Sequence, residues 1–343
     1  MGEDIQYSRE PGHGILESDC YRAAQNYDIH PQYYPDTEML GEHGILKSLL
    51  GTSPRSPKWE HVVCDLCGND DPTLWLEKDG FHYVRCLRCG LVYVTPRLRD
   101  HLLQQDNFYK IVTAGNLEAA AERDQNPRRM KSLIQVARSY LTYKRIGALL
   151  DVGCGFGAFL EAAKSVGWKA YGVEVAIGPA NIAARRHDVF HSCLSDAPYE
   201  PNSFDVVRLN NVIEHVLSPR ALVCDIRRVL RPGGLLAIST PNVESFTAAL
   251  QGMGWRYVQG GHHIYLFGLK TLGKLLEAEG FKLVRVSTPG IRLIDRNGSR
   301  ETRPFFLRKP TGRAVKWAER TLDLAARIAL KGHRIRIRAE KAA

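Results

Sequence analysis

The sequence has no long hydrophobic run and no apolar stretch at its N-terminus. Its longest apolar segments, such as Leu235–Ile238, are far shorter than the roughly 20 residues that a helix needs to cross a bilayer. The first ten residues, MGEDIQYSRE, lack the apolar core of a secretory signal. We therefore expect neither a membrane-spanning segment nor export, and the cytoplasm is the predicted location.

Cysteine is scarce outside two short motifs. Of the eight cysteines, four are scattered and four form the pairs Cys64/Cys67 and Cys86/Cys89, which 18 residues separate. This distribution does not suggest a disulfide framework. A glycine follows each pair and permits the positive φ of a metal knuckle. Two such pairs predict a structural zinc bound by all four thiolates, with a redox pair, another metal or a degenerate site as alternatives.

The net charge of +10 is concentrated near the C-terminus. Residues 291–343 hold 15 Lys or Arg against 5 Asp or Glu, which accounts for the whole excess. Residues 312–331 predict an amphipathic packing helix. Its apolar positions are Val315, Ala318, Leu322, Ala325 and Ala329. An anionic substrate, an acidic carrier protein and peripheral contact with a membrane remain alternatives for this basic segment. Aromatic residues are not interleaved with the charges, which argues against nucleic acid as the partner.

From residue 147 onward, short apolar strands alternate with helices. The expected strands are Ala148–Val152, Lys169–Val175, Asp205–Leu209, Leu235–Thr240 (after a turn at 231–234), Phe281–Ser287 and His333–Ala339. The expected helices are Ala158–Val166, Pro179–Arg186, Pro219–Leu230 and Leu272–Glu279. This alternation predicts a doubly wound, mostly parallel α/β sheet with helices on both faces.

A glycine-rich segment joins the first strand to the first helix. The sequence LLDVGCGFGAFL places Gly153, Gly155 and Gly157 where the backbone can turn tightly and approach a ligand. Glu174 closes the next strand, 21 residues after Gly153, where a carboxylate can accept both hydroxyls of a ribose. These features fit a dinucleotide or another nucleoside cofactor, and a tight turn without any ligand is the remaining alternative.

The whole series of motifs resembles the class I S-adenosylmethionine-dependent methyltransferases. DVGCGFG, GVEV, SFDVVRLNNVIEHV and LRPGGLLAISTPN follow the order and spacing of that family over residues 147–290. They are most similar to the branch of ubiquinone-biosynthesis O-methyltransferases and many sugar and natural-product methyltransferases. The resemblance implies a seven-stranded Rossmann-like sheet with an antiparallel last strand. Residues 86–97 resemble the N-terminal zinc ribbon of many bacterial members.

The same resemblance assigns cofactor-binding residues. Asp151 and the three glycines would line the methionine end of S-adenosylmethionine, Glu174 would hold the ribose, and Asn210 would face the sulfonium. The adenine would lie near Ser195 and Asp196, where this sequence departs from the usual pattern.

Three histidines are candidates for the base that would deprotonate an acceptor hydroxyl, since the pKa of histidine near 6.5 suits neutral pH. His215 follows Glu214, whereas His262 and His263 lie in residues 243–268, the region that the resemblance implies as the acceptor site. We favour His263, because Tyr265 and Phe267 alternate with it on one face. Purely structural roles remain open for all three.

The sequence therefore predicts methyl transfer to a small-molecule acceptor, which the basic segment allows to be anionic. The favoured target is a hydroxyl of a sugar, nucleotide-sugar or natural product. Transfer to carbon or nitrogen, an NAD-type oxidoreductase and a non-catalytic zinc-ribbon interaction protein with a vestigial cofactor fold remain alternatives. The predicted parts are an irregular extension (1–60), a zinc ribbon (61–110), a helical linker or lid (111–146) and the methyltransferase domain (147–343).

Overall fold

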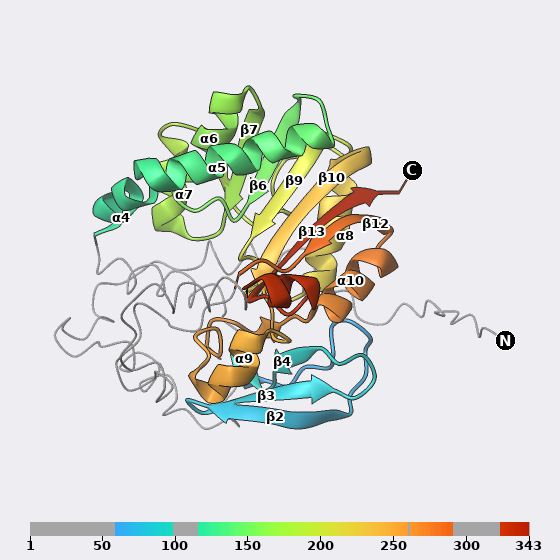
Figure 1. The fold of residues 1–343 in the computed structure, drawn as a ribbon. Helices are drawn as coiled ribbons and strands as arrows, with labels where there is room; N and C mark the ends of the chain where they lie inside the picture. The colour runs from blue at the N-terminus through green and yellow to red at the C-terminus, as the bar shows by residue number, and fades with distance from the viewer. Residues whose placement is uncertain (1–58, 99–115, 260, 291–322, 343) are drawn as a thin grey trace.

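The computed structural model describes residues 59–98, 116–259, 261–290 and 323–342. A seven-stranded sheet with helices on both faces forms the larger part, and a smaller sheet lies beside one of its ends (Figure 1). Nearly all of the predicted N-terminal extension lies outside the described residues. Among the residues that are described, no helix is both long and apolar enough to cross a membrane.

The large sheet has the strand order β12-β13-β10-β9-β6-β7-β8. Its strands are β6 (Ala148–Val152), β7 (Lys169–Glu174), β8 (Asp188–His191), β9 (Phe204–Asn210), β10 (Leu230–Pro241), β12 (Phe281–Ser287) and β13 (Arg334–Lys341). The pairs from β8 through β10 are parallel, and β13 is antiparallel to both of its neighbours. The expected seven-stranded sheet with an antiparallel last strand is confirmed.

Helices cover both faces of this sheet (Figure 1). One side carries α5 (Pro127–Ser139), α6 (Ala158–Val166) and α7 (Ile177–Ala184), and the other carries α8 (Pro219–Val229) and α10 (Leu269–Ala278). The helix α4 (Leu117–Asp124) precedes α5. Side chains of a strand alternate between the two faces. Leu149 accordingly packs in the core beneath α5 and α6, whereas its neighbour Leu150 packs in the core beneath α8 and α10.

Most expected elements are confirmed to within a few residues, and the differences have local causes. The expected turn at 231–234 is instead an irregularity inside β10, where pairing with β9 jumps from Leu230 to Leu235 and Gly233 has a φ of 70°. The edge strand β8 has few buried side chains and therefore gave no apolar pattern. The short helix α9 (Phe246–Gln251) was also not predicted.

The small sheet has the order β11-β4-β3-β2. Three strands come from the cysteine-rich region, namely β2 (Pro72–Lys78), β3 (Phe81–Cys86) and β4 (Val92–Val94). Two short flanking strands, β1 (Trp59–Glu60) and β5 (Arg97–Leu98), pair with each other. The fourth strand of the small sheet, β11 (Tyr265–Leu266), comes from the predicted acceptor region and pairs with β4. The ribbon and the large domain are therefore joined through one continuous sheet.

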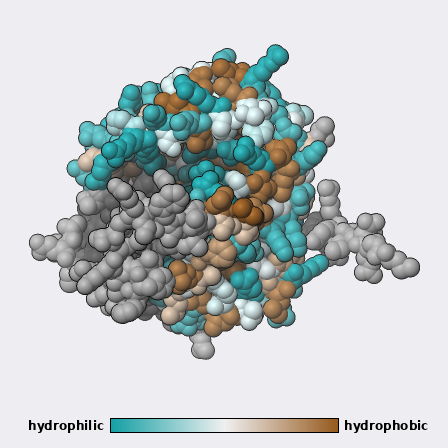
Figure 2. All heavy atoms as spheres, in the orientation of Figure 1, coloured by the Kyte–Doolittle hydropathy of each residue, from teal (hydrophilic) through white to brown (hydrophobic). Residues whose placement is uncertain are grey.

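The described part of the basic C-terminal segment begins at residue 323, and residues 323–328 are helical. Ala326 is fully buried, whereas Ala325 and Ala329 are exposed, so the expected packing face is wrong for these two positions. Leu324 and Ile328 are 60% and 77% exposed. Figure 2 shows hydrophobic residues gathered over this helix and over α9. The remaining positions of the predicted packing face lie outside the described residues.

Candidate active site

The glycine segment forms a tight bend between β6 and α6. Gly153, Gly155 and Gly157 all have positive φ values, of 69°, 54° and 81°. The amides of Gly153 and Cys154 both donate to the carbonyl of Val173 in β7, at 2.9 and 3.1 Å. A Cβ on Gly153 would lie 2.5 Å from the Val212 side chain, so the bend accepts no larger residue there without displacement. Glycine is therefore required by both backbone conformation and space.

Glu174, at the end of β7, points toward this bend. Its Oε2 accepts a hydrogen bond from the amide of Gly155 at 2.8 Å, and its Oε1 accepts one from the amide of Ala176 at 3.0 Å. The side chain is buried, and this burial raises its pKa. A carboxylate has about four lone-pair positions. The two amides therefore leave acceptor capacity for the hydroxyls of a ribose.

Asp151 lies on the face of the sheet beneath α5 and α6. Its Oδ1 accepts from Arg208 Nη1 of β9 at 2.5 Å, and the Arg208 guanidinium lies 3.9 Å from the centre of the Phe159 ring. Burial raises the pKa of Asp151 to about 6, although Arg208 opposes that shift. In this geometry the carboxylate ties β6 to β9. Its contact with a cofactor stays a prediction.

The remaining predicted cofactor residues follow neighbouring strands. Asn210 ends β9 and lies opposite Ser239 of β10. Ser195 and Asp196 lie in the turn after β8, where Ser195 is exposed and burial raises the pKa of Asp196. The carboxyl ends of parallel strands share one edge of a sheet, which is where open α/β sheets bind ligands. The structure thus places these residues at the same edge as the glycine bend and Glu174.

The three predicted histidines form one cluster. The ring centres of His215 and His262 are 4.2 Å apart, those of His215 and His263 are 4.6 Å apart, and those of His262 and His263 are 5.1 Å apart. Val212, which contacts the Gly153 position, precedes His215 by three residues. His215 therefore lies three residues after a side chain that is next to the glycine bend in space, which suits a group that would act on an acceptor beside the cofactor.

Several contacts hold His215 in place. Its Nδ1 lies 2.9 Å from the carbonyl oxygen of His262, and its Nε2 lies 3.9 Å from Glu214 Oε1. Glu214 is buried and accepts a hydrogen bond from the Thr240 hydroxyl at 2.8 Å. Burial lowers the pKa of His215, and the nearby Glu214 only partly opposes this. The His215 ring is therefore uncharged at neutral pH and able to accept a proton.

This arrangement has two chemical capacities. Each imidazole offers one ligand atom, and the three atoms lie within 4.8 Å of one another, a set that divalent transition metals bind. An uncharged imidazole such as that of His215 also suits proton transfer from a hydroxyl.

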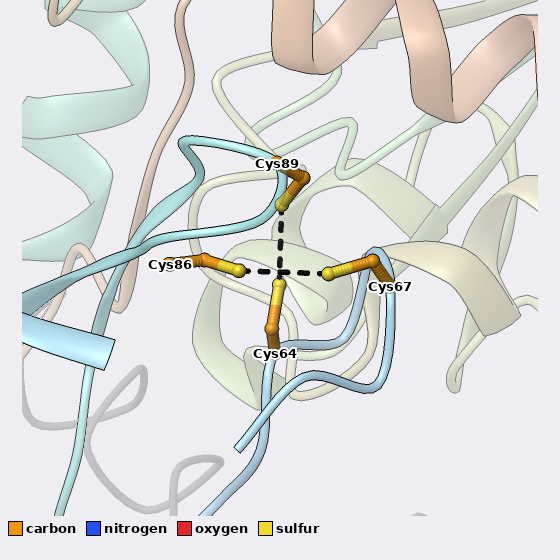
Figure 3. Close-up of side chains that lie close together, drawn as sticks. All are labelled: Cys64, Cys67, Cys86 and Cys89. Carbon is orange, nitrogen blue, oxygen red and sulfur yellow. Dashed lines mark hydrogen bonds between the residues drawn. The ribbon is translucent and has the colours of Figure 1, made fainter. Parts of the chain in front are cut away.

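The four predicted zinc ligands converge on one point (Figure 3). The sulfur atoms of Cys64 and Cys89 are 3.4 Å apart, and those of Cys67 and Cys86 are 3.5 Å apart. These separations exclude disulfides, whose sulfurs lie about 2.05 Å apart. They are close to the spacing of about 3.8 Å that follows from four thiolates placed tetrahedrally about zinc at about 2.3 Å. The donor set therefore fits zinc.

Both cysteine pairs have the backbone of a metal knuckle. The amide of Gly68 donates to the carbonyl of Cys64 at 2.7 Å, and the amide of Gly90 donates to that of Cys86 at 2.9 Å. Both glycines have positive φ, at 69° and 82°. The hydrogen bond from Cys64 lowers the pKa of the Cys89 thiol to about 5. The cluster thus favours a thiolate, which is the form that binds metal.

The bonds that Asp65 and Arg97 make to the histidine region were not predicted from the sequence, whereas a ribbon of this kind could be expected to cap the active site through Tyr83. Tyr83, Asp65 and Arg97 each bond to a segment more than a hundred residues away. No local pattern marks such long-range partners. The only sign of these contacts in the sequence was that the three residues lie near the CxxC pairs.

Comparison with known proteins agrees with this geometry. A family model described as a methyltransferase domain matches residues 120–286. Over these residues the predicted resemblance to class I S-adenosylmethionine-dependent methyltransferases is confirmed.

Two curated relatives are ubiquinone biosynthesis O-methyltransferases. The protein from Cereibacter sphaeroides is 36% identical over 128 residues, which cover 34% of this chain and 51% of the relative. The protein from Burkholderia thailandensis is 28% identical over 185 residues, which cover 50% of this chain and 78% of the relative. The chain thus spans about half the length of the first relative.

Among solved structures, phosphoethanolamine N-methyltransferase 2 of Haemonchus contortus in complex with S-adenosyl-L-methionine is 21% identical with a TM-score of 0.49. The match covers 69% of this chain and 60% of that chain. The assignment rests on the family match and the curated relatives rather than on this likeness.

Proposed function

We propose that this protein transfers the methyl group of S-adenosylmethionine to a hydroxyl of a small molecule, such as a sugar, a nucleotide-sugar or a natural product. The observation that carries the proposal is the close packing of His215, His262 and His263 beside the segment that contacts the glycine bend. A hydroxyl must lose a proton when it is methylated, and these side chains can accept it. The relatives named above act on an oxygen atom by their names, which agrees with this choice.

The reaction needs alignment more than activation, because the sulfonium is already an activated donor. The acceptor oxygen forms a bond to the methyl carbon as the carbon–sulfur bond breaks. The hydroxyl proton passes to an imidazole, and S-adenosylhomocysteine leaves with the electron pair of the broken bond. We assign the proton to His263, which is buried at 7% exposure between the other two histidines and Tyr257. Holding the reactants in line supplies much of the acceleration.

Replacing His263 by alanine is expected to lower kcat by about 10²- to 10⁴-fold, the usual contribution of a general base. Binding of S-adenosylhomocysteine, measured by calorimetry, is expected to stay within about threefold, since the cofactor would lie at Glu174 and the glycines. His82→Ala serves as the control, because this exposed ribbon histidine lies outside the cluster. Full turnover of the His263→Ala variant with the true acceptor would exclude the role.

The pH profile of kcat is expected to be flat through neutrality and to fall on the acid side below pH 6.5. The physical reason is the lowered pKa of His215, whose ring centre lies 4.6 Å from that of His263. Once the pH falls through that lowered value, the positive charge on His215 disfavours transfer of a proton to His263. The same shift makes His215 stabilise the fold above the unfolded pKa of about 6.5, and that contribution is lost as the pH falls. Measurements of turnover and of thermal unfolding from pH 5 to 8 check the pH profile and the pH dependence of stability. A fall in turnover already at pH 7 would contradict an uncharged histidine cluster at neutral pH.

The acceptor is found by a screen of hydroxylated sugars, nucleotide-sugars and phenols for release of S-adenosylhomocysteine. Mass spectrometry with fragmentation of the product then shows whether oxygen, carbon or nitrogen carries the new methyl group. Calorimetry with NAD and with S-adenosylmethionine separates the methyltransferase from an oxidoreductase. Absence of S-adenosylmethionine binding in zinc-loaded protein would overturn the proposal and favour a non-catalytic interaction protein.

We further propose that the ribbon holds one structural zinc through Cys64, Cys67, Cys86 and Cys89. The sulfur geometry and the two glycine knuckles support this. Zinc bound by four thiolates has no open coordination position. It would therefore supply folding energy rather than chemistry. Elemental analysis of the purified protein is expected to find one zinc per chain, and metal-free protein with an ordered ribbon would contradict the proposal.

A further inference from the structure

We propose that the ribbon is the positioning element of the histidine cluster. The ribbon bonds to both chain segments that carry the histidines and so fixes the distance between their imidazoles. This inference rests on the proposed function for the catalytic meaning of the histidines. We call the contacts of the ribbon with these two segments the clamp. The clamp consists of contacts within the chain and does not depend on the proposed function.

The segment that carries His262 and His263 is bound from β3 and β4. The hydroxyl of Tyr83, a residue with no exposed surface, donates to the carbonyl of His263 at 3.0 Å. The amide of Val94 donates to the carbonyl of Ile264 at 2.9 Å. Immediately afterwards the chain enters β11, which pairs with β4 so that Leu266 lies opposite Val92. This side of the cluster is thus part of the ribbon sheet.

The segment that carries His215 is bound from the first knuckle. Asp65, which lies between two zinc ligands, accepts from the Ser218 hydroxyl at 2.8 Å and from the amide of Arg220 at 2.9 Å. These bonds hold the start of α8, three residues after His215. The side chain of Arg97, a buried residue, donates to the carbonyl of Leu217 at 2.8 Å.

One buried joint links the two segments to each other. Arg97 also donates to the Tyr265 hydroxyl at 3.2 Å, and that hydroxyl donates to the Leu217 carbonyl at 3.1 Å. Glu60 holds the other side of the Arg97 guanidinium at 2.8 Å. The peptide amides of Ile264 and Tyr265 donate to the Glu214 carbonyl at 3.0 and 3.2 Å. Loss of the ribbon contacts would therefore loosen both segments and let the distance between His215 and His263 vary.

The test compares two tyrosine hydroxyls of the ribbon in the zinc-loaded full chain. Tyr83→Phe removes the bond to His263, whereas Tyr93→Phe removes a buried hydroxyl that has no hydrogen-bond partner within the described residues. Amide hydrogen exchange by mass spectrometry reports on peptides that cover residues 261–267. Exchange there is expected to rise about tenfold in Tyr83→Phe, as a lost buried hydrogen bond implies. It is expected to be unchanged in Tyr93→Phe.

Two further measurements separate positioning from general damage. Cobalt(II) replaces zinc in the wild-type protein and in both variants. The thiolate-to-cobalt absorption, which reports on the metal site, is expected to be the same in all three proteins. With the acceptor from the screen, Tyr83→Phe is expected to lose about tenfold in kcat at an unchanged KM for S-adenosylmethionine, since small misplacements of reacting groups are costly. Unchanged exchange in Tyr83→Phe, or equal acceleration in both variants, would overturn the clamp. Faster exchange in Tyr83→Phe but not in Tyr93→Phe supports the clamp, whether or not the screen finds an acceptor. Failure to find an acceptor would count against the proposed function and not against the clamp.

Discussion

Removing the zinc that we propose for the ribbon is expected to abolish methyl transfer while the large sheet stays folded. Zinc contributes about 10–16 kcal/mol of apparent binding energy to a small module. This is comparable to the total stability of a typical domain, about 5–15 kcal/mol. A ribbon of short strands cannot replace that contribution by packing alone. Loss of its order would release Tyr83, Asp65 and Arg97 from the two histidine segments.

The experiment treats the protein with a chelator and compares Cys86→Ser with Cys224→Ser, an exposed cysteine outside the knuckles. Turnover is expected to fall at least a hundredfold in Cys86→Ser and on chelation, and to remain normal in Cys224→Ser. Far-ultraviolet circular dichroism and calorimetric binding of S-adenosylhomocysteine are expected to change little. Full turnover in protein shown to be free of metal would contradict the expectation.

Replacing Glu174 by glutamine is expected to weaken S-adenosylhomocysteine binding by about 10- to 150-fold. Hydrogen bonds to a charged acceptor contribute about 1.5–3 kcal/mol each, and the substitution removes the charge that would hold the ribose hydroxyls. It also places an amide group against the backbone donors of Gly155 or Ala176, which disturbs the bend itself. Both effects act on the same ligand.

Calorimetry checks this prediction, with Glu200→Gln as the matched control because that carboxylate is exposed. The control is expected to bind with unchanged affinity. Thermal unfolding shows whether the Glu174 variant is folded. An unchanged affinity in a folded Glu174→Gln protein would remove this carboxylate from the cofactor site.

Elements with a strong local signal could be predicted closely. The strand Ala148–Val152, the helix Ala158–Val166 and the strand Phe281–Ser287 have the predicted bounds, because apolar spacing and glycines mark both of their ends. The edge strand β8 could not be found in this way, since its side chains are mostly exposed. The glycines at 231–234 indicated a turn, but β10 absorbs them as an irregularity because its neighbours pair on both sides.

In the candidate site, too, features with a local signal could be predicted and features that depend on distant residues could not. Cysteine spacing was enough to predict a four-sulfur cluster, because each pair closes within one knuckle. The surroundings of Asp151 depend on Arg208, a residue 57 positions away, and only the folded sheet brings them together. Likewise, the histidines were visible as candidates, but their packing against one another depends on β11, a two-residue strand whose partner lies in the ribbon.

The shared small sheet also sets an order for folding during synthesis. The cysteine knuckles leave the ribosome long before β11, since Tyr83 and its partner His263 are 180 residues apart in the chain. Domains generally fold from the N-terminus as they emerge. The proposed zinc could therefore bind early, but β4 keeps an unpaired edge until the second half of the chain arrives. An edge strand exposed for that long is a site for mispairing with other nascent chains.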